Sequence, residues 1–152
     1  MNNAYMPASK SDNWATPDEL WNRLNELHNF DLDAAASQAN HLCANWYGLD
    51  HEEESRRDAL SIRWEGQRVY VNPPYGRVIN AWIKKGYEHS INGGGRVVML
   101  LPARTDTKWF HDYAVKGKVE FLKGRLKFGN SLQSAPFPSI LVTFDTPSDL
   151  QL

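Results

Sequence analysis

The chain has 152 residues, 41% of them hydrophobic, which suffices for one domain with its own core but not for a second domain of ordinary size. Its formal net charge is −1, and its single cysteine, Cys43, excludes an intramolecular disulfide and fits a reducing compartment. No run approaches the roughly 20 apolar residues that span a bilayer, and residues 1–10 lack a signal-peptide core, so we expect a soluble, cytoplasmic protein that makes no membrane contact. We expect a single domain at residues 13–146, with a loose N-terminal tail at 1–12 and a C-terminal tail at 147–152.

Acidic and basic side chains are unevenly distributed along the chain. Residues 1–60 carry 4 basic and 11 acidic side chains, whereas residues 61–95 carry 5 and 2, and residues 96–127 carry 8 and 3. The basic second half suits a polyanion that approaches this part of the protein. The alternative is a solvated face, because segments of different charge need not form separate surfaces.

The first predicted element is a helix that begins at Thr16 and ends near His28. Thr16 suits the N-cap, Pro17 suits the first helical position, and two acids follow in the first turn. Apolar residues at helical spacing predict the buried face of this helix: Leu20, Leu24 and Leu27.

Residues 30–36 predict a strand that turns into small residues. The carboxylates of Asp31 and Asp33 would suit a ligand with cationic groups, and Ala34 and Ala35 would let it approach the backbone. An aspartate that caps the next helix is the competing interpretation.

Residues 37–60 contain no long predicted element. Residues 43–48 predict a short strand and a turn, and residues 50–57 predict an exposed, charged helical turn. Asp58 follows this turn.

The segment from Arg68 to Gly76 predicts the functional centre of the chain. A short apolar run rich in β-branched residues reads as a buried strand, and Pro73 and Pro74 must end it because proline donates no ladder hydrogen bond. Asn72 then lies at the carboxyl end of a strand, where open α/β sheets place their ligands. An amide oxygen, a rigid main-chain carbonyl and the Tyr75 ring together predict a grip on a planar amine. A proline turn with a packed tyrosine is the simpler alternative.

Strands and helices alternate through the rest of the chain, which favours a three-layer α/β sandwich with a mainly parallel sheet. Pro102 ends one of the predicted strands, and Thr105 or Asp106 suits the cap of a helix near Trp109. A helix is predicted at 78–91, and strands at 96–101, 119–122, 126–128 and 140–144.

Basic residues recur in the loops and strand ends that follow Asn72. We interpret them as candidate phosphate contacts, with surface ion pairs as the alternative. They are Arg77, Arg104, Lys108, Arg125 and Lys127.

Several common chemistries lack their sequence patterns here. The five histidines show no His-x-x-x-His pair, and one cysteine cannot build a zinc ribbon, so we expect no metal. The chain also has no Gly-x-Ser-x-Gly or Walker A pattern.

Asn72-Pro73-Pro74-Tyr75 resembles the catalytic motif of S-adenosylmethionine-dependent amino methyltransferases, and more of the chain resembles the phage DNA N-6-adenine methyltransferases of the Dam type. The resemblance covers nearly all of residues 13–145. Its segments are Trp14 to Pro17, Phe30 to Ala36, Asn72 to Tyr75, Val97 to Trp109 and Ala135 to Ser139.

This resemblance implies a class I, Rossmann-like methyltransferase fold with an antiparallel C-terminal strand, and methyl transfer to the 6-amino group of a flipped adenine in double-stranded DNA. It makes Asn72, Pro73, Pro74 and Tyr75 the catalytic set. The Gly-x-Gly loop of many methyltransferases is absent, as it is in this family. The implied S-adenosylmethionine contacts are Trp14, Thr16, Pro17, Asp31, Asp33, Ala34, Ala35, Asp58 and Asn72.

Other functions remain open at this point. The same motif occurs in enzymes that methylate cytosine, RNA bases or protein glutamine, and a non-catalytic nucleic-acid-binding module on the same scaffold is a further alternative. The resemblance also implies a bacterial host and a phage or prophage origin. The oligomeric state stays open, with a homodimer as one option, and base recognition would come from loops such as 37–57 and 123–138.

Overall fold

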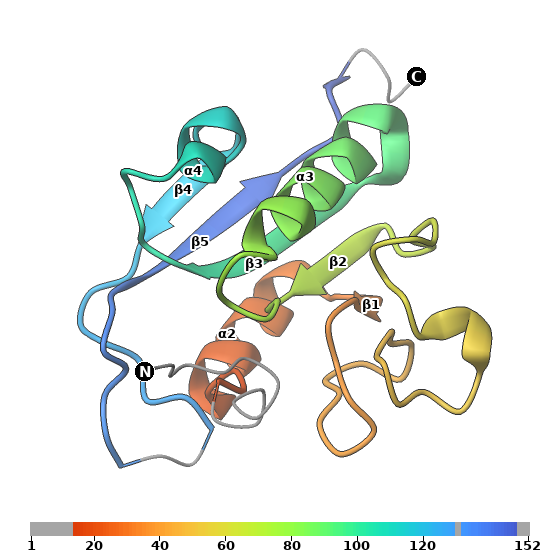
Figure 1. Ribbon diagram of the computed structural model, residues 1–152, viewed down its shortest axis with the longest axis horizontal. Helices are drawn as coiled ribbons and strands as arrows, with labels where there is room; N and C mark the ends of the chain where they lie inside the picture. Colours follow the sequence, from red (N-terminus) through yellow and green to blue (C-terminus); the bar gives the residue numbers. More distant parts are fainter. Residues whose placement is uncertain (1–13, 130–131, 149–152) are drawn as a thin grey trace.

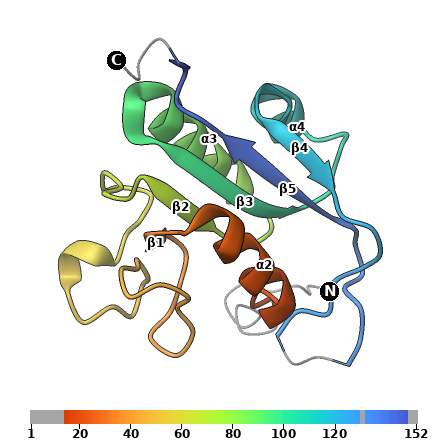
Figure 2. The same cartoon turned by 180° about the vertical axis from the view of Figure 1, so that it is seen from behind.

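The computed structural model describes residues 14–129 and 132–148. The expected tail at 1–12 and most of the tail at 147–152 lie outside these ranges. The described residues form a five-stranded sheet in the order β1-β2-β3-β5-β4. Helices α3 and α4 lie on one face and α2 on the other, as Figures 1 and 2 show from opposite sides. The strands are β1 (Leu32–Asp33), β2 (Arg68–Val71), β3 (Arg96–Pro102), β4 (Lys118–Phe121) and β5 (Ser139–Phe144).

The sheet is mixed rather than mostly parallel, which corrects part of the expected fold. β1 pairs parallel with β2 and β2 with β3, but β3 and β4 both pair antiparallel with β5. The reversed C-terminal strand is therefore confirmed. β5 lies between β3 and β4 and runs in the opposite direction to both, so both of its ladders are antiparallel. The parallel ladder between β1 and β2 has only two residue pairs.

Helix α2 (Asp18–His28) begins one residue later than predicted. Pro17 occupies the N-cap position and no side chain caps the helix, so the predicted capping role of Thr16 is wrong. Leu20 and Leu24 are buried as predicted, but Leu27 is 75% exposed because the buried face ends one turn earlier.

Helix α3 (Ile79–His89) lies within the predicted range and continues into a π-helical turn, η3 (Ser90–Gly94). Helix α4 (Lys108–Asp112) is capped by Thr107, whose hydroxyl accepts from the amide of Phe110, rather than by Thr105 or Asp106. The strand predicted at 126–128 does not form. The three-residue helical turns are η2 (Glu54–Arg56) and η4 (Ala114–Lys116).

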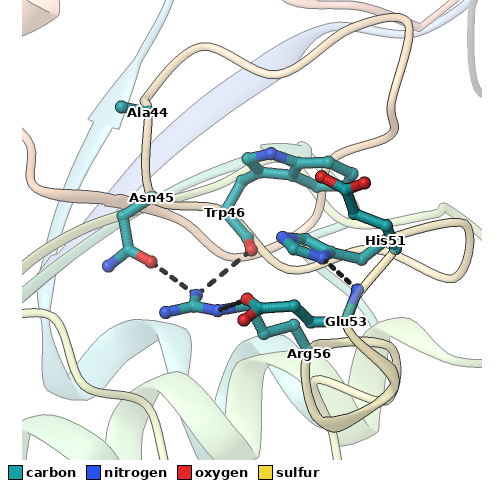
Figure 3. A pocket seen from close by; sticks show the side chains of 7 residues that line it. Ala44, Asn45, Trp46, His51, Glu53 and Arg56 are labelled. Carbon is teal, nitrogen blue, oxygen red and sulfur yellow. Dashed lines mark hydrogen bonds and ion pairs between the residues drawn. The ribbon is translucent and has the colours of Figure 1, made fainter.

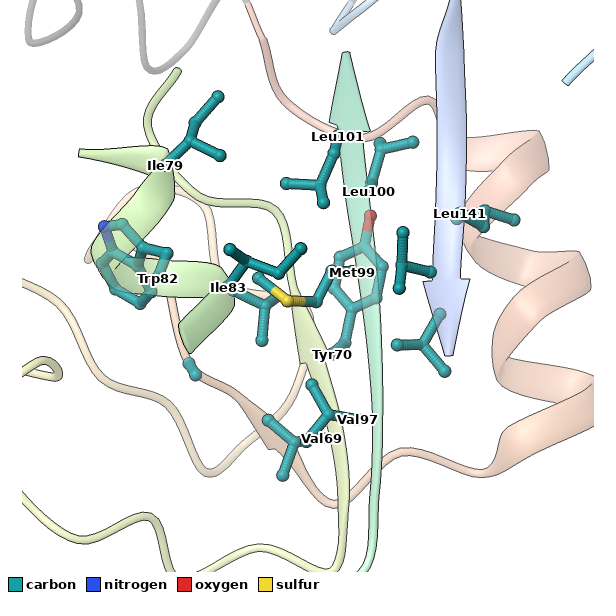
Figure 4. Close-up of a cluster of buried hydrophobic side chains, with 14 of the residues drawn as sticks. Val69, Tyr70, Ile79, Trp82, Ile83, Val97, Met99, Leu100, Leu101 and Leu141 are labelled. Carbon is teal, nitrogen blue, oxygen red and sulfur yellow. The ribbon is translucent and has the colours of Figure 1, made fainter. Parts of the chain in front are cut away.

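The core lies on both sides of β3, whose residues 97–101 are all buried. In Figure 4, Ile79, Trp82 and Ile83 approach the sheet from α3, and Leu141 lies on the neighbouring β5. Burial of each such aliphatic side chain contributes about 1.5–3 kcal/mol. This packing fixes the strand ends from which the polar loops emerge.

A separate finding concerns length and hydrophobicity. Within residues 14–129 and 132–148, no helix is both long enough and apolar enough to cross a bilayer.

Candidate active site at the carboxyl edge of the sheet

The parallel strands β1, β2 and β3 bring three predicted segments to one edge of the sheet. Asp33 ends β1, Asn72 follows β2, and Arg104 follows β3. Asp33 lies directly opposite Tyr70 in the β1–β2 ladder, two residues before Asn72. The carboxyl ends of parallel strands lie at the same end of the sheet, so these residues share that end although they are far apart in sequence.

The side-chain amide of Asn72 is held at both ends. Its Nδ2 donates to the carbonyl of Trp14 at 2.7 Å and to Thr16 Oγ1 at 3.2 Å. Its Oδ1 accepts from the Tyr75 hydroxyl at 3.1 Å. The reversed amide would set two carbonyl oxygens against each other, so these contacts fix which end of the amide is the acceptor.

Tyr75 is buried, and its hydroxyl also donates to the carbonyl of Leu100 at 3.2 Å. Burial raises the pKa of this hydroxyl well above its ordinary value, and the nearby Arg104 guanidinium opposes the rise. The hydroxyl therefore stays protonated at neutral pH and can act as the donor to Asn72 Oδ1. Pro73 beside it is buried and Pro74 is exposed.

An aromatic cluster covers the Tyr75 ring. The ring of Trp14 lies at a centroid distance of 6.2 Å, that of Phe128 at 6.3 Å and that of Phe137 at 5.5 Å. Trp14 and Phe137 also contact each other at 5.2 Å. Tyr75 is therefore not an open stacking platform in this structure, and a base could reach it only if the cluster rearranged.

Asp33 is buried at the end of β1, and its carboxylate accepts from the amide of Leu42 at 3.0 Å. Burial raises the pKa of this carboxyl to about 6, although hydrogen bonds from the backbone of Leu42 and Ala35 lower it. Ala34 beside it is completely buried and Ala35 is half-buried. A desolvated carboxylate near small residues favours a cationic ligand.

Two other predicted cofactor contacts do not meet this group. Asp31 precedes β1 and accepts from the amides of Gln67 and Arg68 at the opposite edge of the sheet. Asp58 is exposed and accepts from Ser61 Oγ at 2.7 Å. Asp31 thus secures the beginning of β2, and the Asp58 carboxylate bonds to a serine three residues further along the chain.

The chain belongs to a known family. The sequence model of the DNA N-6-adenine-methyltransferase (Dam) family matches residues 3–145. This protein is a member of the Dam family.

A DNA N-6-adenine-methyltransferase of Escherichia phage T1 is 36% identical over 107 residues, which cover 68% of this chain and 41% of that protein. One of Haemophilus phage HP1 is 28% identical over 147 residues, which cover 90% of this chain and 80% of that protein. The chain thus matches about two-fifths of the length of the T1 relative. No solved structure matches the chain.

The basic residues singled out in this Dam-family chain are all exposed. Lys108 forms an ion pair with Asp112 at 3.5 Å. Among the described residues, the other four form no ion pair, which leaves them more available to phosphates. These residues follow the ends of β2, β3 and β4. Lys123, which was not predicted as a phosphate contact, is also exposed and follows β4.

Two depressions in the described part of the protein lie away from Asn72. One, of about 530 Å³, is shown in Figure 3, where the Trp46 and His51 rings lie 4.2 Å apart above Arg56. The other, of about 720 Å³, lies near Trp64 and His89. Neither depression is lined by Asn72 or Tyr75 of the Dam-family motif.

Three residues of this edge were not predicted as individual site residues, although Phe128 and Phe137 lie in the loop at 123–138 that was expected to recognise the base. Tyr70 shares a 2.6 Å hydrogen bond with Thr16, and Phe128 and Phe137 contact Tyr75. Strand periodicity carried a signal for Tyr70, since residues two apart face the same side of a sheet. The positions of Phe128 and Phe137 depend on a long loop, which has no comparable periodicity. Among the described residues, no group of three His, Cys, Asp or Glu side chains could hold a metal ion.

Proposed function

We propose that this protein is an enzyme that transfers a methyl group to the exocyclic 6-amino group of adenine in DNA. The observation that carries this proposal is the fixed Asn72 amide, with its oxygen as acceptor, at the carboxyl edge of a Dam-family sheet. The names of both phage relatives, DNA N-6-adenine-methyltransferase, support the choice of acceptor.

The chain's own residues would act on the exocyclic amine of the base. The lone pair of this amine is delocalised into the base ring. Two acceptors aimed at the amine hydrogens favour a pyramidal nitrogen that attacks the methyl group more readily. Asn72 Oδ1 and the Pro73 carbonyl would supply these acceptors, and Tyr75 would stack on the base. The amine would have to replace the Tyr75 hydroxyl as the donor to Asn72 Oδ1. No dedicated base is needed, because the amine can lose its proton after attack.

S-Adenosylmethionine is the proposed donor; when bound, it supplies a methyl group on a sulfonium and leaves as S-adenosylhomocysteine. The residues present fit such a cationic group. The Asp33 carboxylate is desolvated, and the small side chain of half-buried Ala35 beside it would let a ligand approach the backbone. We assign cofactor binding to Asp33, Ala34, Ala35, Trp14 and Pro17. Thr16 is left out of this set, because its hydroxyl already bonds to Tyr70 and Asn72. Asp31 is engaged at the other end of β1, and Asp58 stays a proposed contact.

Double-stranded DNA is the proposed substrate, with its phosphates held by Arg77, Arg104, Arg125 and Lys127. The target adenine would leave the stack at a cost of a few kcal/mol. The phage relatives support action in the cytoplasm of a bacterial host.

The arrangement of strands supports assignment to the class I, Rossmann-like methyltransferases. β1, β2 and β3 run parallel, the C-terminal strand β5 enters reversed beside β3, and Trp46 forms an isolated parallel bridge with Asp33 at the outer edge. Helices on both faces complete the three layers.

Methyl-labelled S-adenosylmethionine tests the activity directly. The protein is incubated with DNA, RNA and protein acceptors, and digested products are separated. We expect label in N6-methyladenine from DNA, and none with Asn72→Ala or with DNA in which every adenine is already N6-methylated. Label in cytosine, RNA or protein, or no transfer despite cofactor binding, would contradict the proposal.

A further inference from the structure

A chain of hydrogen bonds runs from the core to the predicted catalytic amide. The Tyr70 hydroxyl and Thr16 Oγ1 lie 2.6 Å apart and are buried. Thr16 Oγ1 accepts from Asn72 Nδ2 at 3.2 Å. This series of hydrogen bonds ends where Asn72 Oδ1 accepts from the Tyr75 hydroxyl. The nitrogen of the amide is thus bound to the Thr16 side, and its oxygen faces the donor that a base amine would replace.

The core end of this chain is rigid. The Tyr70 ring is fully buried and packs at 5.2 Å from Trp21 and at 5.4 Å from Phe30, one on α2 and one before β1. Tyr70 also lies opposite Asp33 in the β1–β2 ladder. Its hydroxyl is therefore set by packing on two sides and can serve as a fixed reference for Thr16.

Thr16 reaches Asn72 because it does not cap its own helix. The helix begins after Pro17 without a side-chain cap, which leaves the Thr16 hydroxyl for tertiary contacts. Tyr70 lies in β2 and Asn72 directly follows that strand, so the alternation of side chains directs both to the same side of the sheet. Thr16 lies between them and bonds to both.

We propose that Thr16 and Tyr70 are positioning residues that hold the Asn72 amide with its oxygen directed at the acceptor amine. The inference rests on the proposed function for its catalytic meaning, but the hydrogen-bond chain can be tested without activity. It assigns the Thr16 hydroxyl to Asn72, whereas the resemblance implied a contact with the cofactor. Precise orientation matters because a small error in geometry can cost much of the rate.

Three variants test this assignment: Thr16→Val removes the hydroxyl at nearly constant shape, Thr16→Ser keeps it, and Tyr70→Phe removes its buried partner. We expect Thr16→Val to lower kcat about tenfold and Tyr70→Phe to lower it about threefold. The effect of Thr16→Val should be limited, because the Trp14 carbonyl still holds Asn72 Nδ2. Thr16→Ser should keep kcat within about twofold, and cofactor Kd should stay within about twofold in all three.

The double variant separates a connected chain from general loosening. If Tyr70 acts through Thr16, adding Tyr70→Phe to Thr16→Val should cost no further activity. The proposal would be overturned if the losses of kcat in the two single variants multiplied in the double variant. A large rise in cofactor Kd with unchanged kcat in Thr16→Val would also overturn it.

NMR of the Asn72 side-chain amide provides the readout that does not depend on turnover. Its protons should exchange slowly in the wild type and in Thr16→Ser, and at least about tenfold faster in Thr16→Val. Equal exchange in all three proteins would refute the hydrogen-bond chain. A wild type with no methyl transfer but with this protection pattern would instead refute the proposed function and retain the chain.

Discussion

Similar side chains have different roles at the two ends of the parallel strands β1, β2 and β3. We call the end where these strands begin the amino edge and the end where they finish the carboxyl edge. At the amino edge, Asp31 accepts from two backbone amides and lies 3.7 Å from the Arg68 guanidinium, in contact with solvent. Two residues later, at the carboxyl edge, Asp33 is 3% exposed and the pKa of its carboxyl is raised to about 6. The Asp31 carboxylate has its hydrogen-bond and ion-pair partners within the fold. The Asp33 carboxylate is desolvated, and a cationic ligand would stabilise its charged form.

A second pair of polar groups shows the same contrast. Arg96 and Asp145 form a half-exposed ion pair at 2.6 Å at the beginning of β3, where it joins two strand ends. Asn72, beyond the end of β2, bonds to the segment before α2 and to the hydroxyl of Tyr75. We infer that polar residues at the amino edge stabilise the sheet, and that those at the carboxyl edge are arranged for chemistry.

The largest expected effect is that of Asn72→Ala on methyl transfer. Loss of the acceptor oxygen should lower kcat by about 100-fold or more, because the interaction develops in the transition state. The cofactor Kd should change by no more than a few fold. Turnover measured under saturating cofactor, with Kd from calorimetry, checks both values; equal losses in kcat and cofactor affinity would make Asn72 a structural residue.

The next largest effect should follow Asp33→Asn, which keeps the shape and removes the charge. We expect cofactor affinity to fall about tenfold at pH 8 because a buried carboxylate no longer faces the cation. Stability should not fall, since the buried charge is costly. Unchanged cofactor affinity in Asp33→Asn would contradict this prediction and would mean that the cofactor binds elsewhere.

The pH dependence of the wild type sharpens this prediction. Because the folded-state pKa of Asp33, about 6, exceeds the ordinary value of 3.8, the native state binds an extra proton between these values. The contribution of this group to the unfolding free energy should therefore increase as the pH falls from about 6 to about 4. Cofactor affinity should decrease over the same range in the wild type more than in Asp33→Asn, as titration calorimetry at several pH values can show.

A smaller effect is expected from charge removal around the carboxyl edge. Arg125→Ala and Lys127→Ala should each weaken DNA binding several fold and reduce the slope of log Kd against log salt by about one phosphate contact. Lys108→Ala serves as the matched control, because its ion pair with Asp112 engages it already. Fluorescence anisotropy over a salt series measures the slope. Identical slopes for all three variants would argue against this surface.

The smallest effect on catalysis should come from the amino edge. Asp31→Ala leaves the amides of Gln67 and Arg68 without their carboxylate acceptor and should lower the free energy of unfolding by about 1–2 kcal/mol. Turnover at temperatures where the variant is folded should be unchanged. A large loss of cofactor affinity in a stable variant would restore Asp31 to the site and blur the contrast between the edges.

The sequence by itself determined the local elements around Asn72. The apolar run at 68–71 and the following prolines allowed no other reading than a strand that ends at the amide, since proline breaks the ladder. The helix near 79–89 followed from its apolar spacing in the same way. Asp33 at the end of a strand was equally accessible, because burial and strand length are local patterns.

Only the tertiary structure decided which polar groups meet. Asp31 and Asp33 are nearly identical in sequence context, and they differ because Asp31 precedes the two-residue strand β1 whereas Asp33 ends it. The same holds for Thr16, whose local signal indicated a helix cap but whose hydroxyl bonds to residues 54 and 56 positions away. Hydrogen bonds of such separation depend on how packed strands and loops are set against each other, and one-dimensional periodicity does not contain that information.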